Sequence, residues 1–138
     1  MGRAVSIFLD ACIVIYLVEG TDGFSEQIGD AMRGVGPALF CVNDLVRLEC
    51  LVGPLRRHDA DLRAAYKRQF EALRVLDMSG EVYDLAAELR AHHGLKTPDA
   101  LHAATAIQHG CEELWTGDSR LAALGTRIKL RVFANVRA

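Results

Sequence analysis

Short apolar runs alternate with amphipathic stretches along the whole chain. Residues 4–9 are apolar and rich in β-formers, which is typical of a strand buried on both faces of a sheet. Similar runs predict strands at 38–42, 74–78, 113–116 and 130–133. Helices are expected between them, at 11–19, 24–33, 45–52, 58–73, 80–93, 98–109 and 119–124. The alternation predicts an α/β fold, a three-layer domain with a mainly parallel central sheet of about five strands flanked by helices.

Capping and breaking residues set the expected ends of these helices. Asn43 or Asp44 is expected to cap the helix at 45–52, and Gly53-Pro54 is expected to end it. Thr97 is expected as the N-cap of the helix that starts at Pro98, which puts Asp99 in the first turn. The helix at 58–73 is expected to bury an apolar side formed by Leu62, Ala65, Phe70 and Leu73.

Length and composition fit one ordinary globular domain covering residues 1–138. The net charge of −2 does not indicate a protein that coats nucleic acid non-specifically. No apolar run approaches the length of a membrane span, and Asp10 interrupts the apolar start of the chain. We therefore expect a cytoplasmic protein without a membrane segment. Buried free thiols are expected, because no C-x-x-C pair occurs among Cys12, Cys41, Cys50 and Cys111.

Four acids stand at element boundaries from which they can converge. Asp10 and Asp118 follow predicted strands, and ligands of parallel sheets bind beyond the carboxyl ends of strands. Asp99 lies at a helix start, where a carboxylate commonly serves only as a partner of the helix dipole. Glu49 has apolar neighbours on both sides, which indicates that its side chain points inward. An inward carboxylate is unfavourable unless it is paired or bound to a metal.

A set of carboxylates without a neighbouring metal-binding cysteine or histidine suits a hard cation. Mg²⁺ and Mn²⁺ prefer oxygen ligands and keep several waters. Such an ion can deprotonate a water and stabilise the charge of a phosphodiester during in-line attack. Converging acids without a cation repel one another and raise their pKa values. The residues therefore predict metal-assisted hydrolysis.

The order of these motifs resembles the PIN-domain ribonucleases, most of all the VapC toxins of bacterial toxin–antitoxin modules. The resemblance covers nearly the whole chain and rests on Val5-Ser6-Ile7-Phe8-Leu9-Asp10, Glu49, Pro98-Asp99-Ala100 and Leu114-Trp115-Thr116-Gly117-Asp118. It implies a Mg²⁺- or Mn²⁺-dependent endoribonuclease that cleaves RNA by a metal-activated water. It further implies a single PIN domain, a homodimer, and a cognate VapB-type antitoxin that blocks the site.

The resemblance also assigns roles to residues. Asp10 and Asp99 match the principal metal ligands of the family, and Asp118 matches its fourth acid and a third metal ligand. Glu49 matches the second acid, and Thr116 matches a hydroxyl position before the fourth acid; all five form the expected catalytic set. The chain departs from the family after Asp10, where Ala11-Cys12 replaces a small hydroxyl or amide residue. This departure concerns the hydrogen bonds around Asp10.

Other readings stay open at this stage. The chain can be a PIN nuclease of RNA processing without an antitoxin, or a catalytically weak PIN module that binds RNA or protein. An aspartyl-phosphate phosphatase is disfavoured, because Cys12 stands where a second aspartate is needed. The basic residues Arg56, Arg57, Arg63, Lys67 and Arg68 form either an RNA-tracking face or ordinary solvated helix faces.

Four more side chains lie near the expected site. Lys96 and Arg120 are each within a few residues of a site acid, which makes them the favoured contacts for a substrate phosphate. His102, one turn after Asp99, is expected to have a structural role, since the metal mechanism needs no imidazole. Trp115 is expected in the core rather than as a surface for base stacking.

Overall fold

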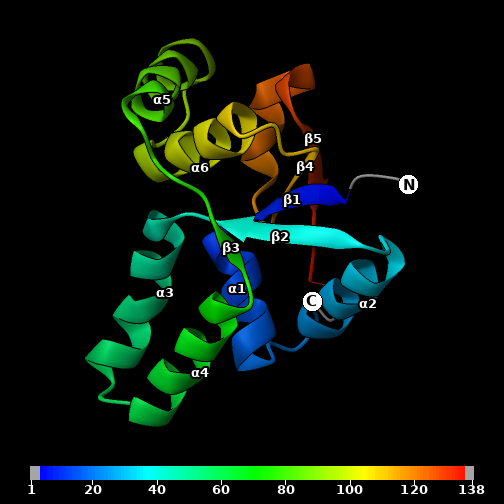
Figure 1. The fold of residues 1–138 in the computed structure, drawn as a ribbon, viewed down its shortest axis with the longest axis vertical. Helices are drawn as coiled ribbons and strands as arrows, with labels where there is room; N and C mark the ends of the chain where they lie inside the picture. The colour runs from blue at the N-terminus through cyan, green and yellow to red at the C-terminus, as the bar shows by residue number, and fades with distance from the viewer. Residues whose placement is uncertain (1–3, 136–138) are drawn as a thin grey trace.

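The structure is a computed structural model that describes residues 4–135. At its centre is a five-stranded sheet in the order β3-β2-β1-β4-β5 (Figure 1). All four strand pairs are parallel. The strands are β1 (Val5–Leu9), β2 (Ala38–Val42), β3 (Arg74–Val75), β4 (Glu113–Thr116) and β5 (Lys129–Val132). The predicted parallel sheet is thus confirmed, and the central pair β1 and β4 ends beside Asp10 and Asp118.

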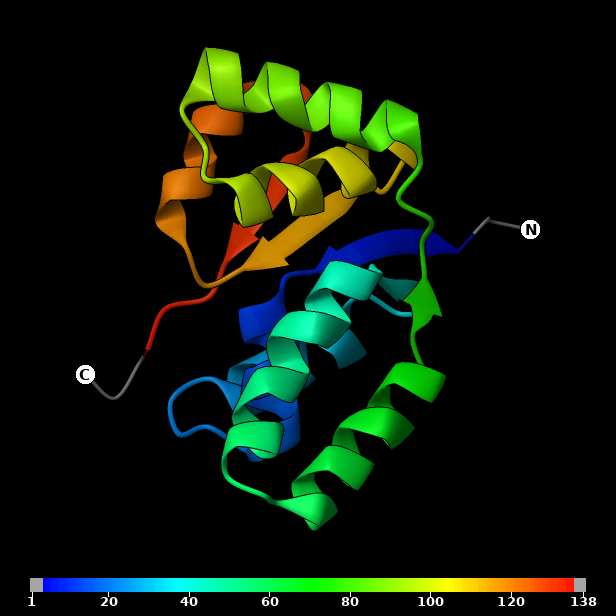
Figure 2. The same cartoon turned by 90° about the vertical axis from the view of Figure 1, so that its left-hand side faces the viewer.

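Helices cover both faces of the sheet and give the three predicted layers. Figures 1 and 2 show α5 and α6 on one side of the sheet and α1 to α4 on the other. Their bounds are α1 (Ala11–Glu19), α2 (Ser25–Gly34), α3 (Asp44–Arg56), α4 (Ala60–Glu71), α5 (Gly80–His93), α6 (Thr97–Gln108) and the 3₁₀ helix η1 (Ser119–Arg127). Within residues 4–135, no helix has both the length and the apolar character that a membrane crossing requires.

The core extends over both faces of the sheet, and the part that positions the site lies between β1, β4 and α6. Ile7, Phe8 and Leu9 of β1 have no solvent exposure, which explains why this strand lacks a polar face. The buried face of α6 is made mostly of small residues, Ala100, Ala103, Ala104 and Ala106. Short side chains allow α6 to approach its neighbours closely, and this holds Asp99 at the sheet edge where β1 and β4 end.

Two expected helix ends were wrong. The helix α3 continues through Gly53-Pro54 to Arg56. Pro54 stands in the last turn and is buried, and the turn still closes through the N–H of Arg57, which donates to Gly53 O at 3.1 Å. A proline at this position removes one hydrogen bond of the helix. Since α3 ends shortly after Pro54, little helix remains beyond it to be kinked. The helix α6 starts one residue earlier than predicted, with Lys96 rather than Thr97 as N-cap and no side-chain capping bond.

The structure also differs at the sheet margins. The third strand is limited to Arg74–Val75, because after the N–H of Leu76 donates to Val42 O the chain leaves the sheet edge. The last helix is 3₁₀ and extends to Arg127, with an interruption at Gly125 where φ is 62°. The last strand accordingly runs over 129–132. In α4 the residues buried most deeply are Tyr66 and Phe70, so Tyr66 was missed as a core residue.

Candidate active site

Asp10 is held in place from two sides at the carboxyl end of β1. It is the N-cap of α1, and its Oδ1 accepts a hydrogen bond from the N–H of Ala11 at 2.7 Å. Its Oδ2 accepts one from Thr116 Oγ1 at 2.7 Å. The N–H of Asp10 donates to Trp115 O at 3.0 Å, which ties the end of β1 to β4. The carboxylate is buried, with 8% exposure, and its orientation is determined by these bonds.

Thr116 links Asp10 to Asp118. Its hydroxyl is fully buried, donates to Asp10 and accepts the N–H of Asp118 at 3.0 Å. Asp118 in turn binds the Arg120 guanidinium, with Nη2 2.7 Å from Oδ2. The Arg120 hydrogen bond lowers the pKa of Asp118, and Lys96 adds to this effect through its charge. Asp118 therefore stays ionised at the rim of the site.

Asp99 lies in the first turn of α6 and shares the same region. Burial raises its pKa, and the negative charges of Asp10 and Asp118 raise it further. His102 and Arg120 act in the opposite direction. The charges of Asp10 and Asp118 both act on Asp99, so the three carboxylates lie close enough to influence one another.

Glu49 reaches this cluster from α3 through a histidine. Its Oε1 lies 2.5 Å from His102 Nε2, and the same nitrogen lies 3.8 Å from Asp10 Oδ1. The Glu49 side chain is 32% exposed, so it points inward at the margin of the site. The structure thus brings together all four acids and Thr116, which the sequence analysis singled out.

His102 is the residue that sequence reasoning undervalued. Its side chain is 1% exposed and lies between Glu49 and Asp10 rather than in the apolar core alone. The signal was its position one turn after Asp99 on the same helix. What could not be read from the sequence is that α3 places Glu49 within hydrogen-bonding distance of this ring.

Cys12 takes part in the hydrogen bonds around Asp10. Its thiol donates to Asp10 Oδ2 at 3.7 Å, and its Sγ accepts the N–H of Gly117 at 3.2 Å. Burial and the charge of Asp10 raise the Cys12 pKa to about 12, which keeps the thiol protonated and able to donate. The departure at Ala11-Cys12 therefore leaves Asp10 well supported. All four cysteines are free thiols, as predicted, and Cys41, Cys50 and Cys111 are buried.

The donor chemistry fits a divalent cation, although the side chains are not arranged around one. No group of three or more His, Cys, Asp or Glu side chains in residues 4–135 has the geometry to hold a metal ion. Arg120 forms a salt bridge with Asp118, and His102 lies within hydrogen-bonding distance of Glu49. The carboxylates of Asp10, Asp99 and Asp118 nevertheless offer oxygen ligands. Burial raises the pKa of Asp99, the negative charges of Asp10 and Asp118 raise it further, and a cation would relieve that repulsion.

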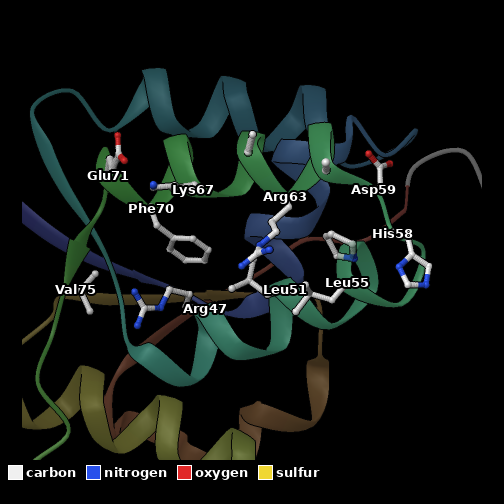
Figure 3. Close-up of a pocket in the computed structure, with 13 residues that line it drawn as sticks. Arg47, Leu51, Leu55, His58, Asp59, Arg63, Lys67, Phe70, Glu71 and Val75 are labelled. Atoms are coloured by element: carbon white, nitrogen blue, oxygen red, sulfur yellow. The ribbon is translucent and has the colours of Figure 1, made fainter.

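A separate groove lies between α3 and α4 (Figure 3). Leu51, Leu55 and Phe70 supply apolar side chains to its lining. The charged residues of the lining are Arg47, Arg63 and Lys67 on the basic side and Asp59 and Glu71 on the acidic side. None of the four acids lines it. Trp115, by contrast, is fully buried and belongs to the core, as expected.

Solved structures with the same fold come from toxin–antitoxin systems. VapBC-1 from nontypeable Haemophilus influenzae superposes with a TM-score of 0.76 at 16% identity and covers 94% of this chain and 98% of that chain. A toxin–antitoxin complex from Klebsiella pneumoniae gives 0.73 at 22% identity, with 88% and 94% covered. VapC20 from Mycobacterium tuberculosis, a sarcin-ricin loop cleaving toxin, gives 0.70 at 19% identity, with 86% and 95% covered.

At these identities the superpositions show a shared fold. No curated protein sequence matches the chain significantly. The family model described as PIN domain matches residues 7–126. That range contains most of β1, all of β4, the helices between them, and all four acids of the site. The chain belongs to the PIN domain family.

Proposed function

We propose that this protein is a Mg²⁺- or Mn²⁺-dependent endoribonuclease and the toxin of a VapBC-type toxin–antitoxin pair. The observation that carries the proposal is that the acids gather where β1 and β4 end: Thr116 links Asp10 to Asp118, and His102 lies between Asp10 and Glu49. Asp99 belongs to the same cluster, since burial and then the charges of Asp10 and Asp118 raise its pKa. Membership of the PIN family and the likeness to toxin structures support it.

Asp10, Asp99 and Asp118 are the residues that would hold the ion. When bound, a divalent cation lowers the pKa of a coordinated water and screens phosphate charge. Thr116 fixes Asp10 by donating to Oδ2, so this carboxylate needs little reorganisation to bind a cation. Glu49, which is partly exposed, is suited to orient an incoming water and accept its proton. Arg120 and Lys96 supply positive charge beside Asp118 for the substrate phosphate.

Cleavage of a mixed RNA pool with mapped ends tests the enzymatic part. Wild type is expected to cleave with Mg²⁺ or Mn²⁺ and to stop in excess chelator. Asp99→Asn is expected to abolish cleavage while the chain stays folded. Asp84→Asn makes the same chemical change at an exposed position of α5 and serves as the matched control. Undiminished cleavage by the Asp99 variant, or in chelator, contradicts the mechanism; RNA binding without cleavage favours the binding-module alternative.

The antitoxin partner is the second part of the proposal. The lining of the groove between α3 and α4 combines apolar side chains with an excess of basic ones, Arg47, Arg63 and Lys67 against Asp59 and Glu71. This composition suits a protein segment with apolar and acidic side chains (Figure 3). The groove includes residues of α3, the helix that carries Glu49, so an occupant lies next to an element of the site.

Growth measurements test the toxin role. Expression of wild type alone is expected to arrest growth, whereas Asp99→Asn is not. Co-expression with a short DNA-binding protein encoded by the neighbouring gene should restore growth, and Arg63→Glu with Lys67→Glu should weaken that rescue. Normal growth with active wild-type enzyme would favour the RNA-processing alternative.

A further inference from the structure

His102 is the buried side chain that connects two acids of the site. It lies on the inner face of α6, 1% exposed, one turn after Asp99. Its Nε2 is 2.5 Å from Glu49 Oε1 and 3.8 Å from Asp10 Oδ1. One ring nitrogen therefore faces two carboxylates that come from different helices and are far apart in the sequence.

The surroundings of the ring favour one arrangement of its proton. Phe8 of β1 packs against it, with 5.8 Å between the ring centroids. Nδ1 is buried and has no hydrogen-bond partner among the described residues. A proton on Nε2 donates to Glu49 and leaves only a lone pair at Nδ1. The opposite tautomer would bury an unpaired N–H at Nδ1 and bring the Nε2 lone pair against a carboxylate.

Glu49 needs such a partner to stay at the site. Its side chain has three rotatable torsions and 32% exposure, so water is an accessible alternative environment. Repulsion from the other carboxylates drives it in the same outward direction. Asn43, the N-cap of α3, donates to Thr105 Oγ1 of α6 at 2.9 Å. This bond restrains the position of α3 relative to α6, but it does not restrain the Glu49 side chain.

We propose that His102 is a positioning residue, whose Nε2–H holds the Glu49 carboxylate facing Asp10. The inference rests on the proposed function of the acid site. His102 acts through Glu49 and not on the substrate, because its ring is buried beneath the carboxylates.

Two variants of similar length separate this role from simple packing. His102→Gln keeps an amide donor near the position of Nε2, whereas His102→Met fills the space without a donor. Mn²⁺ affinity of the full-length chain is measured by calorimetry, with thermal unfolding to verify that each variant is folded. We expect His102→Met to weaken Mn²⁺ binding about tenfold and His102→Gln to stay within about threefold. The reason is that Glu49, held beside the three ligands, adds negative charge to the site, and outer partners of metal ligands have effects of this size. In a Glu49→Ala background the two should bind Mn²⁺ equally.

A second measurement leaves His102 unchanged. Ring ¹⁵N shifts of wild type are expected to show the proton on Nε2, and Glu49→Ala should remove this preference. A proton on Nδ1, equal Mn²⁺ affinity of the Gln and Met variants, or a loss that persists without Glu49 would each overturn the inference. Wild type that binds Mn²⁺ but cleaves no RNA contradicts the proposed function alone; wild type that binds no Mn²⁺ contradicts both.

Discussion

At the scale of single residues, three of the four acids of the site have a neighbour that determines the direction of the side chain. Thr116 donates to Asp10, Arg120 binds Asp118, and His102 lies against Glu49. Asp99 differs, because its surroundings disfavour the ionised carboxylate. Burial is the largest cause of its raised pKa, followed by the negative charges of Asp10 and Asp118. The surroundings of Asp99 thus disfavour its negative charge. This affects the stability of the metal-free fold and the binding of a cation.

Asp99→Asn should stabilise the metal-free protein at pH 7. The folded pKa of Asp99 is raised above the unfolded value of 3.8, so the folded state binds protons more tightly, and stability falls as pH rises through that raised pKa. The neutral amide avoids this loss. We expect a Tm increase on the order of 1–3 °C, which is small because Asp99 is only partly buried. Thermal unfolding in chelator at pH 7 and near pH 4 tests this: the difference should shrink at the lower pH.

Mn²⁺ should reverse that order. A bound cation stabilises only a folded state that can hold it, so wild type should gain Tm with added Mn²⁺ while Asp99→Asn gains little. Asp84→Asn should follow wild type in both series. If Asp99→Asn lowers Tm in chelator, the carboxylate is stabilising the fold, and the repulsion inferred for the site is wrong.

Arg120→Gln should tighten Mn²⁺ binding. Arg120 forms a salt bridge with the Asp118 carboxylate and adds positive charge beside it. Removal of the guanidinium therefore frees the Asp118 carboxylate to bind the cation. The pair is largely exposed, and such pairs contribute little, so we expect a gain of about two- to fivefold by calorimetry. Arg68→Gln, an exposed change on α4, is the control. Weaker Mn²⁺ binding in Arg120→Gln would show that the guanidinium supports the carboxylate instead of competing for it.

At the scale of helices and strands, the bounds that depend on local residue preferences were predicted from the sequence. The bounds of α1, β2 and β4 are as predicted, and Gly20 and Gly94 end their helices with φ of 62° and 66°. The errors arose where tertiary packing overrides local preference. Pro54 is accepted inside α3 because it stands in the last turn, with its own side chain buried. The strand β3 is short because the chain leaves the sheet after the N–H of Leu76 donates to Val42 O.

The candidate site also has a part that local sequence signals predict and a part that depends on tertiary packing. Asp10, Asp99 and Asp118 were found because strand ends and helix starts are visible in the sequence. The contact between Glu49 and His102 depends on how α3 packs against α6, which no local pattern encodes. Asn43 controls that packing: its Oδ1 accepts the N–H of Val46, and its Nδ2 donates to Thr105.

Asn43→Ala should therefore destabilise the protein by about 1–2 kcal/mol, the usual effect of losing an N-cap, and displace Glu49. Ser79→Ala is the matched control, because Ser79 occupies the N-cap of α5 without a side-chain capping bond. Urea unfolding should give Ser79→Ala a change within about 0.5 kcal/mol. Equal effects of the two substitutions would mean that the cap and the bond to Thr105 contribute nothing specific.

At the scale of the molecule, two surfaces have different chemistry. The acid site lies where β1 and β4 end, whereas the basic residues of α4 border an apolar groove (Figure 3). An apolar lining favours a protein segment over an RNA backbone, which gains from phosphate contacts. The homodimer stays a prediction.

RNA binding should therefore be insensitive to the groove. In an Asp99→Asn background, which prevents cleavage, Arg63→Glu with Lys67→Glu should leave the RNA Kd within about twofold. Lys96→Glu, beside Asp118, should weaken RNA binding about tenfold and reduce its salt dependence, as expected for a lost phosphate contact. Fluorescence anisotropy at two salt concentrations measures both. A large effect of the groove variants would assign α4 to the RNA path.

The order of the strands has one more consequence, which concerns synthesis of the protein. The site draws on the end of β1 and on the turn after β4, which are far apart in the sequence, with Asp10 and Asp118 meeting through Thr116. A ribosome that has not yet passed Asp118 carries only three of the four acids. On the proposed function, a translation product that stops before Asp118 therefore lacks the complete acid site, and cleavage of RNA is expected only once Asp118 has been added and has met Asp10.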